Sequence, residues 1–136
     1  VSLLAISLLA ISFSFPWGEV MRDHKNLRAF ELADEVALLT YKFTQNFPRE
    51  EQFGLTSQMR RAAVSVPSNI VEGCGRHTEA EFLRFLDVAY GSLRELEYQT
   101  SLAVRLEFVS NHDDFTAKLI EASKVLAALI RSIRKS

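Results

Sequence analysis

The chain has 136 residues, of which 48% are hydrophobic and 24% are charged, and its formal net charge is -1. This length and balance are typical of one soluble globular domain with its own core, and the charge supplies no global positive field for nucleic acid. Five glycines and three prolines are too few for a β protein built on many tight turns. The single cysteine excludes an intramolecular disulfide and a cysteine-rich zinc site, and it fits a reducing compartment.

Residues 1–20 differ in character from the rest of the chain. They read VSLLAISLLAISFSFPWGEV, carry no charge before Glu19 and repeat SLLAI in tandem. A secretory signal needs a basic start and a small-residue cleavage site, and a membrane span needs about 20 apolar residues, whereas this apolar run breaks at Pro16. We expect residues 1–20 to be an apolar extension outside the fold, from a misassigned start, with a non-standard signal or anchor as the alternative. Residues 21–136 then form the domain.

Helical spacing of apolar residues begins soon after Met21. The first segment spans residues 27–47 and ends before Pro48, because the residue that precedes a proline avoids helical geometry. Its expected core face consists of Leu27, Phe30, Ala33, Ala37, Tyr41, Thr44 and Phe47.

The second segment starts near Leu55 and meets the stretch VSVPSNIVEGCGR at residues 64–76. If the helix continues through Pro67, the ring removes one amide and clashes with the carbonyl of Ala63, which predicts a kink. Ser65, Ser68 and Asn69 would then hydrogen-bond the freed backbone groups. The alternative is a loop between two shorter helices. In both cases the glycines of GCGR predict the helix stop.

The third segment has the clearest start, because TEAE at residues 78–81 matches a capping box. Gly91 lies in its middle, where a small residue would let another helix approach closely. The fourth segment starts around residues 110–114, where Asp113 and Asp114 suit the positive end of the helix dipole. The expected core positions of the two segments are Phe82, Leu86, Ala89, Leu93, Leu96, Thr100, Ala103, Leu119, Ala122, Leu126, Leu129 and Ile133. Four such helices with short connections predict an all-α, antiparallel up-down-up-down four-helix bundle.

Some apolar faces are wider than one stripe. The extra apolar positions are Val36, Phe43, Phe115, Val125 and Ile130. A wide face indicates either a second contact surface, and hence self-association, or a broad core. The sequence leaves both interpretations open.

The spacing of the histidines and the cysteine does not favour a metal site or a nucleophilic cysteine. A metal-binding bundle would need Glu-x-x-His pairs, and none of His24, His77 and His112 has Glu three residues before it. We interpret these histidines as surface or capping residues and expect no metal and no cofactor. Cys74 has Arg76 and His77 near it in the sequence, but a small packing residue at a helix end is the preferred interpretation.

One spacing has a sharper functional interpretation. Arg105 and His112 are separated by six residues, which resembles the Arg-x4–6-His motif of the HEPN superfamily of helical ribonucleases. In that chemistry the arginine would stabilise phosphate charge and the histidine would act in general acid–base catalysis. The motif departs from the superfamily at Leu106, where a polar residue is usual.

Basic residues concentrate in the second segment and near the C-terminus. A patch that binds the phosphate backbone of RNA or DNA would form if the fold gathers Arg60, Arg61, Arg76, Lys124, Arg131, Arg134 and Lys135.

Two strings resemble a known family. FGLTSQMRRAAVSVPSNIVEGCGR at residues 53–76 and EFLRFLDVAYGSLRELE at residues 81–97 closely resemble the bacterial four helix bundle proteins, first found in intervening sequences of large-subunit ribosomal RNA genes. The resemblance covers the chain from about Met21 to the C-terminus and leaves residues 1–20 outside.

The resemblance implies a cytosolic, non-enzymatic four-helix bundle that assembles as a homopentamer around a central channel. A related branch, the accessory variability determinant of diversity-generating retroelements, binds a reverse transcriptase and nucleic acid, but that branch is strongly basic. The resemblance therefore suggests a scaffold that is an adaptor for nucleic acid or a nucleoprotein partner. The family string also suggests a packing and assembly role for Arg61, Pro67, Ser68, Asn69, Glu72 and Gly73.

Overall fold

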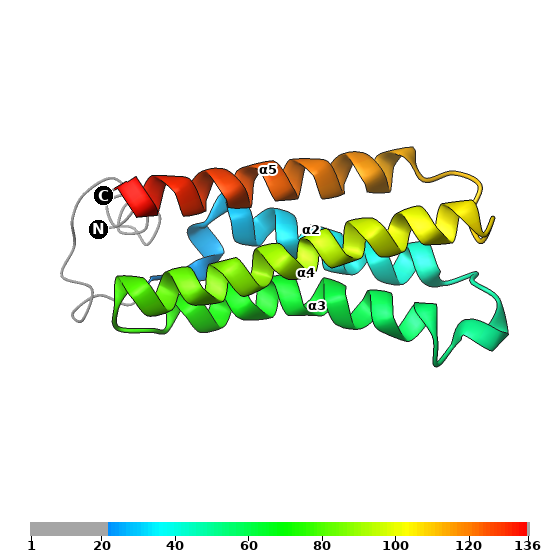
Figure 1. Ribbon diagram of the computed structural model, residues 1–136, viewed down its shortest axis with the longest axis horizontal. Coiled ribbons are helices and arrows are strands. Elements are labelled where there is room, and N and C mark those ends of the chain that lie inside the picture. Colours follow the sequence, from blue (N-terminus) through cyan, green and yellow to red (C-terminus); the bar gives the residue numbers. More distant parts are fainter. Residues whose placement is uncertain (1–21, 136) are drawn as a thin grey trace.

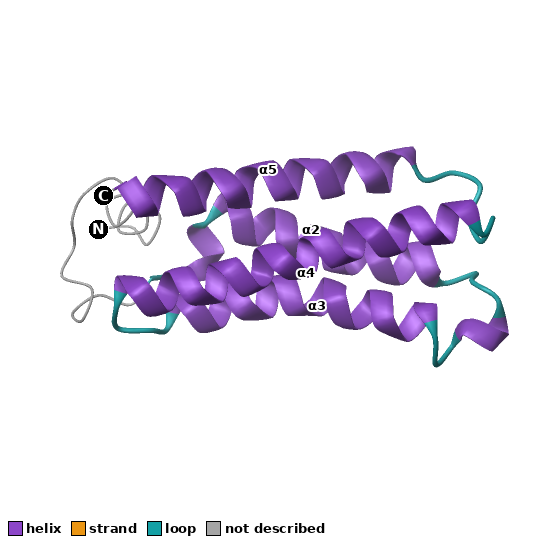
Figure 2. Ribbon diagram, in the orientation of Figure 1, coloured by secondary structure: helices purple, strands orange, loops and turns teal. Residues whose placement is uncertain are grey.

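The structure, a computed structural model, describes residues 22–135, and these residues form four α-helices. The helices are α2 (Arg28–Thr44), α3 (Leu55–Cys74), α4 (Glu79–Arg105) and α5 (Asp113–Lys135), and the short 3-10 helices η1 (His24–Asn26) and η2 (Arg49–Glu51) precede α2 and α3. This part of the chain contains no strand (Figure 2). The predicted all-α class with four helices is confirmed. The expected extension at residues 1–20 lies outside the described residues.

The helices form a bundle in which each packs against two neighbours. α3 lies between α2 and α4, and α5 lies between α4 and α2. The colours of Figure 1 run in the same direction along α2 and α4 and in the opposite direction along α3 and α5. Consecutive helices are therefore antiparallel neighbours. Each connection joins the end of one helix to the adjacent start of the next.

Buried side chains from all four helices form one core. Phe82, Leu86, Leu93, Leu96 and Leu126 are each at most 1% exposed. All the core positions predicted for α4 are buried, and those predicted for α5 are buried except Leu129, which packs against the core while partly exposed. The extra apolar positions also belong to this core: Val36, Phe115 and Ile130 are buried, and Phe43 and Val125 pack against it. A broad core explains the wide apolar faces.

The predicted core face of α2 is correct at Ala33 and Thr44 but wrong at Tyr41. The predicted core residue Tyr41 is 46% exposed, whereas its neighbour Thr40 is completely buried. Thr40 can be buried because its hydroxyl donates a hydrogen bond to the Val36 carbonyl at 2.7 Å, and Thr44 donates likewise to the Thr40 carbonyl at 2.9 Å. With their hydroxyls satisfied, these threonines behave as apolar residues.

The start of α4 confirms half of the predicted capping box. Thr78 is the N-cap, and its hydroxyl oxygen accepts a hydrogen bond from the Glu81 amide at 3.1 Å. The Glu81 carboxylate contacts the Thr78 hydroxyl at 3.4 Å rather than the backbone amide of the reciprocal motif.

Candidate functional site

The stretch at residues 64–76 is helix rather than loop for most of its length. α3 continues through Pro67 to Cys74 and ends at Gly75, so the loop alternative is wrong. The side-chain amide of Asn69 donates hydrogen bonds to the Ser65 carbonyl at 2.8 Å and to the Ser65 hydroxyl at 3.0 Å. That hydroxyl in turn lies 2.8 Å from the hydroxyl of Ser92 on α4. Asn69 is therefore tied to the neighbouring helix through Ser65. The kink at Pro67 stays a prediction.

Gly73 lies where α3 packs closely on α4. A Cβ atom on Gly73 would lie 2.9 Å from the Phe85 Cβ and 3.2 Å from the Phe82 Cδ1, closer than side chains ordinarily pack. The glycine therefore acts in packing. Gly91, which the sequence suggested for such an approach, has no atom within 4 Å of a Cβ built on it.

The remaining residues of the expected assembly motif lie on the exposed side of α3. Glu72 pairs with Arg76 one turn later, at 2.9 Å between carboxylate and guanidinium, and makes no hydrogen bond or ion pair to another helix within residues 22–135. The Arg76 guanidinium also lies over the ring of Phe85 on α4, 4.7 Å from its centroid. Arg61 and Ser68 are exposed, and Arg61 has no carboxylate within ion-pair distance among residues 22–135.

Cys74 is a buried packing residue. It is 2% exposed, and burial raises the pKa of its thiol to about 12, although the positive charge of Arg22 acts in the opposite direction. The Arg22 amide donates to the Cys74 carbonyl at 3.3 Å, and the Arg22 guanidinium lies 4.3 Å from the centroid of the Phe82 ring. A protonated, enclosed thiol is a poor nucleophile, so the packing interpretation agrees with the structure.

The seven predicted basic residues lie on α3, just after it and on α5, and their gathering into one patch stays a prediction. Arg60 and Arg61 line a groove of about 610 Å3 between α2 and α3, together with Tyr41, Phe53 and Val64. Lys124 and Arg131 line cavities between α4 and α5, where Arg134 also pairs with Asp87. The two sets share no lining residue, and Arg76 follows α3, which ends at Cys74. Lys135 is the last residue of α5.

The groove between α2 and α3 carries the most exposed large apolar side chain of the described residues. Phe53, in the connector before α3, is 89% exposed. Across the groove, the Arg60 guanidinium donates to the Thr44 hydroxyl at 2.9 Å and lies 4.6 Å from the centroid of the Tyr41 ring. Arg60 is thereby held in place, whereas its neighbour Arg61 extends to solvent.

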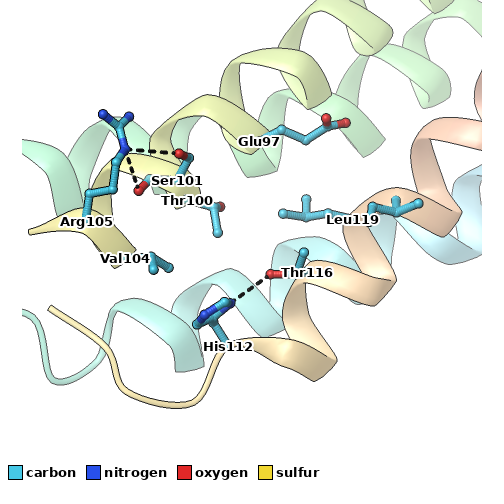
Figure 3. A pocket seen from close by; sticks show the side chains of 9 residues that line it. Glu97, Thr100, Ser101, Val104, Arg105, His112, Thr116 and Leu119 are labelled. Carbon is cyan, nitrogen blue, oxygen red and sulfur yellow. Dashed lines mark hydrogen bonds between the residues drawn. The ribbon is translucent and has the colours of Figure 1, made fainter. Parts of the chain in front are cut away.

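Arg105 and His112 line one pocket of about 380 Å3 between the end of α4 and the start of α5. The Arg105 guanidinium points away from His112 and donates to the carbonyl and hydroxyl of Ser101, at 3.3 and 3.2 Å (Figure 3). His112 contacts the Thr116 hydroxyl at 3.3 Å. Acid–base cleavage of RNA needs the two side chains to converge on one phosphate, and here they diverge. The ribonuclease hypothesis is not supported.

The described residues contain neither a candidate metal site nor a candidate membrane span. They contain no group of three or more His, Cys, Asp or Glu side chains arranged to hold a metal ion. Within the same range, none of the helices combines the length and the apolar composition that crossing a membrane requires.

Comparison with known proteins places this bundle in a family. None of the curated proteins matches the chain. One similar solved structure is the crystal structure of a protein of unknown function from the S23 ribosomal protein family of Bacteroides thetaiotaomicron. It is 25% identical, has a TM-score of 0.68, and the match covers 76% of this chain and 95% of that one. The profile of the family described as 23S rRNA-intervening sequence protein matches residues 25–128. The chain belongs to the 23S rRNA-intervening sequence protein family.

Proposed function

We propose that the chain is a non-enzymatic scaffold that assembles with copies of itself. The observation that carries this proposal is an exposed apolar surface on α2 and α3, which we call the assembly patch: Leu38, Tyr41, Phe53, Val64 and Val71. Tyr41, Phe53 and Val64 line one groove, Leu38 lies one turn from Tyr41, and Val71 lies two turns from Val64. Exposed apolar surface of this kind is typical of protein–protein contacts.

The outer side of α4 offers a complementary surface on the same chain. Val88, Gly91, Glu95 and Tyr98 follow helical spacing and are all exposed, with Val88 at 45% and Tyr98 at 61%. Glu95 has no cation within ion-pair distance in the described part of the chain, just as Arg61 beside the assembly patch has no carboxylate. A contact between two different surfaces is heterologous and forms a closed ring when the rotation between copies permits.

We infer that the assembly patch of one copy packs on the α4 surface of the next, with Arg61 opposite Glu95. The expected number of copies is five, which rests on the family resemblance. Light scattering on the chain at micromolar concentration then gives about 77 kDa for five copies, compared with 15.4 kDa for one. A monomer at these concentrations would refute the scaffold proposal.

A charge exchange tests the predicted pairing between Arg61 and Glu95. Arg61→Glu and Glu95→Arg should each reduce the measured mass, because like charges would meet across the contact. The double variant should restore it. Arg49→Glu is the matched control, since Arg49 is exposed and lies outside both surfaces. Assembly that survives both single variants would show that other surfaces form the contact.

A nucleic-acid adaptor role has weaker support. The net charge is -1, and the basic residues divide between separate places in one chain. We propose it only for an assembly that gathers basic residues from several copies. Binding to generic RNA and DNA across a salt series tests it, because phosphate contacts weaken steeply with salt. Absence of binding at low salt would remove this role.

A further inference from the structure

A long groove runs between α4 and α5, on helices that the assembly patch does not use. Three cavities of about 380, 320 and 210 Å3 adjoin along it. The first and second share Glu97 and Ile120, and the second and third share Tyr90, Ala127 and Arg131. Along α4 the groove extends from Asp87 to Arg105, which at 1.5 Å per residue is about 27 Å. We call it the α4–α5 groove.

Apolar side chains occur in each cavity of the α4–α5 groove, among polar and charged ones. They include Val104, Leu119, Ile120, Ala127 and Ile130. Ile120, a large aliphatic side chain, lies where two of the cavities meet and is 47% exposed. Tyr90 lines the two cavities at the other end. Such a surface gains free energy when an apolar side chain covers it.

The charges around this lining are mostly positive. The groove has five cationic side chains, Arg94, Arg105, Lys124, Arg131 and Arg134, and two carboxylates, Asp87 and Glu97. Both carboxylates already have partners within the groove, because Asp87 pairs with Arg134, and Glu97 pairs with Arg94 at 3.1 Å. Lys124 and Arg131 have no carboxylate within ion-pair distance among residues 22–135. The groove thus has unbalanced positive charge beside apolar surface.

We propose that the α4–α5 groove binds an amphipathic helix of a partner protein that carries Asp or Glu beside its apolar stripe. A helix of about 18 residues would cover 27 Å, place its apolar residues on Ile120 and Ala127, and bring carboxylates to Lys124 and Arg131. A phosphate backbone would use the cations and leave the apolar lining uncovered. The groove shares no lining residue with the assembly patch or the α4 surface, although the Arg105 guanidinium lies 6.0 Å from the centroid of the Tyr98 ring on that surface.

Binding of designed peptides to the full chain tests the proposal. The first peptide has 18 residues, with leucines at helical spacing, glutamates on both flanks and a fluorescent label read by anisotropy. A second carries lysine for each glutamate, and a third carries serine for each leucine. We expect only the first to bind, because the groove requires both negative charge and apolar side chains. Binding of the third as tightly as the first, or tight binding of an 18-nucleotide single strand, would show a general polyanion site instead.

Variants locate the binding. Lys124→Glu/Arg131→Glu should weaken the first peptide about tenfold or more, since two attractive contacts become repulsive. Lys42→Glu/Arg49→Glu makes the same change of net charge at exposed positions outside the groove and should leave the affinity unchanged. Ile120→Ser should weaken the peptide without changing net charge. Circular dichroism confirms that each variant is folded, and light scattering measures its assembly.

The outcomes separate the proposal from the assembly scaffold. Failure of the first peptide to bind, or equal affinity for the wild-type chain and Lys124→Glu/Arg131→Glu, would overturn the groove proposal whatever the oligomeric state. If that double variant instead lost assembly, the occupant would be a second copy of the chain, and the partner-helix proposal would fall.

Discussion

Gly73 on α3 lies directly against Phe85 on α4, and a Cβ atom at position 73 would stand 2.9 Å from the Phe85 Cβ. The neighbouring aromatic rings are buried, with Phe82 at 0% and Phe85 at 6% exposed, so neither can move aside freely. Overpacking of this kind costs about 1–3 kcal/mol, whereas alanine in a helix gains about 1 kcal/mol over glycine. We expect Gly73→Ala to lower the free energy of unfolding by up to about 2 kcal/mol in urea titrations followed by circular dichroism.

Gly91→Ala is the matched comparison, because both glycines lie inside helices. Nothing lies within 4 Å of a Cβ at Gly91, so the substitution should raise the free energy of unfolding of a monomer by about 1 kcal/mol through helix propensity alone. A Phe53→Asp chain, shown by light scattering to be monomeric, is the background for this measurement. In the assembled protein the same substitution should reduce the measured mass, because Gly91 lies on the α4 surface proposed to meet the next copy. Stabilisation in both backgrounds would place Gly91 outside the contact.

Pro67 removes one backbone hydrogen bond from the interior of α3. An alanine amide at this position would bond the Ala63 carbonyl, and proline in a helix interior costs about 3 kcal/mol relative to alanine. We expect Pro67→Ala to raise the free energy of unfolding by about 1–3 kcal/mol in the monomeric background. If stability falls instead, the helix around Pro67 needs the proline geometry to pack.

The hydrogen bonds from Asn69 through Ser65 to Ser92 connect α3 and α4. Asn69→Ala removes two donated hydrogen bonds, of 2.8 and 3.0 Å, and we expect it to cost about 1–2 kcal/mol. Ser92→Ala removes the link to α4. A double-mutant cycle of the two should give a coupling energy above about 0.5 kcal/mol, since they share Ser65. Additive effects would mean that the two bonds act separately.

The spacing of apolar residues predicted the helices and most of their buried positions, but it misassigned the core position at Tyr41 on α2. On α4, every predicted core position is buried. On α2, the predicted Ala33 and Thr44 are buried, but Tyr41 is exposed and Thr40 takes its place in the core. The sequence did not reveal that Thr40 would satisfy its hydroxyl within the helix, because that depends on local geometry.

The candidate surfaces depended on how the helices are rotated, which a single sequence does not specify. The sequence suggested close approach at Gly91 and a packing role for Gly73, and within the chain a Cβ meets a neighbouring helix at Gly73 but not at Gly91. The sequence left open whether the fold gathers the basic residues, and Arg61 and Arg131 line different grooves on different helices. The α4–α5 groove was missed because its apolar lining and its cations come from two helices that are brought together only by the fold.

Ion pairs between α2 and α5 give stability a dependence on pH. The Arg28 guanidinium lies 3.0 Å from the Glu121 carboxylate, and the Lys118 ammonium lies 3.0 Å from Glu35 and 3.4 Å from Glu121. Burial tends to raise the pKa of Glu121, but hydrogen bonds from Lys118 and Arg28 outweigh it and lower that pKa. The hydrogen bond to Glu35, followed by that to Glu121, raises the pKa of Lys118.

The signs of these shifts define where the pairs stabilise the fold. A carboxylate whose pKa is lowered by folding stabilises the fold at pH values above its pKa in the unfolded chain, and this stabilisation is lost as the pH falls through its pKa in the folded chain. A lysine whose pKa is raised by folding stabilises the fold at pH values below its pKa in the unfolded chain, and this stabilisation is lost as the pH rises through its pKa in the folded chain. Glu121→Gln should therefore lower the melting temperature slightly at pH 7, and the difference should shrink below about pH 4 and in high salt. Glu50→Gln, at an exposed carboxylate without an ion pair in the described residues, should show no such difference.

The buried thiol of Cys74 should report opening of the bundle. With 2% of the residue exposed and a thiol pKa of about 12, almost no thiolate is available to a reagent at pH 8 in the folded chain. We expect iodoacetamide to label Cys74 at a rate set by unfolding, and far faster in urea, where the pKa returns to about 8.5. Gly73→Ala should accelerate labelling under native conditions, because the overpacked contact with Phe85 lowers the free energy of opening and the opened population rises exponentially with that loss. Rapid labelling of the folded wild-type chain at neutral pH would contradict both the burial of Cys74 and its role in packing.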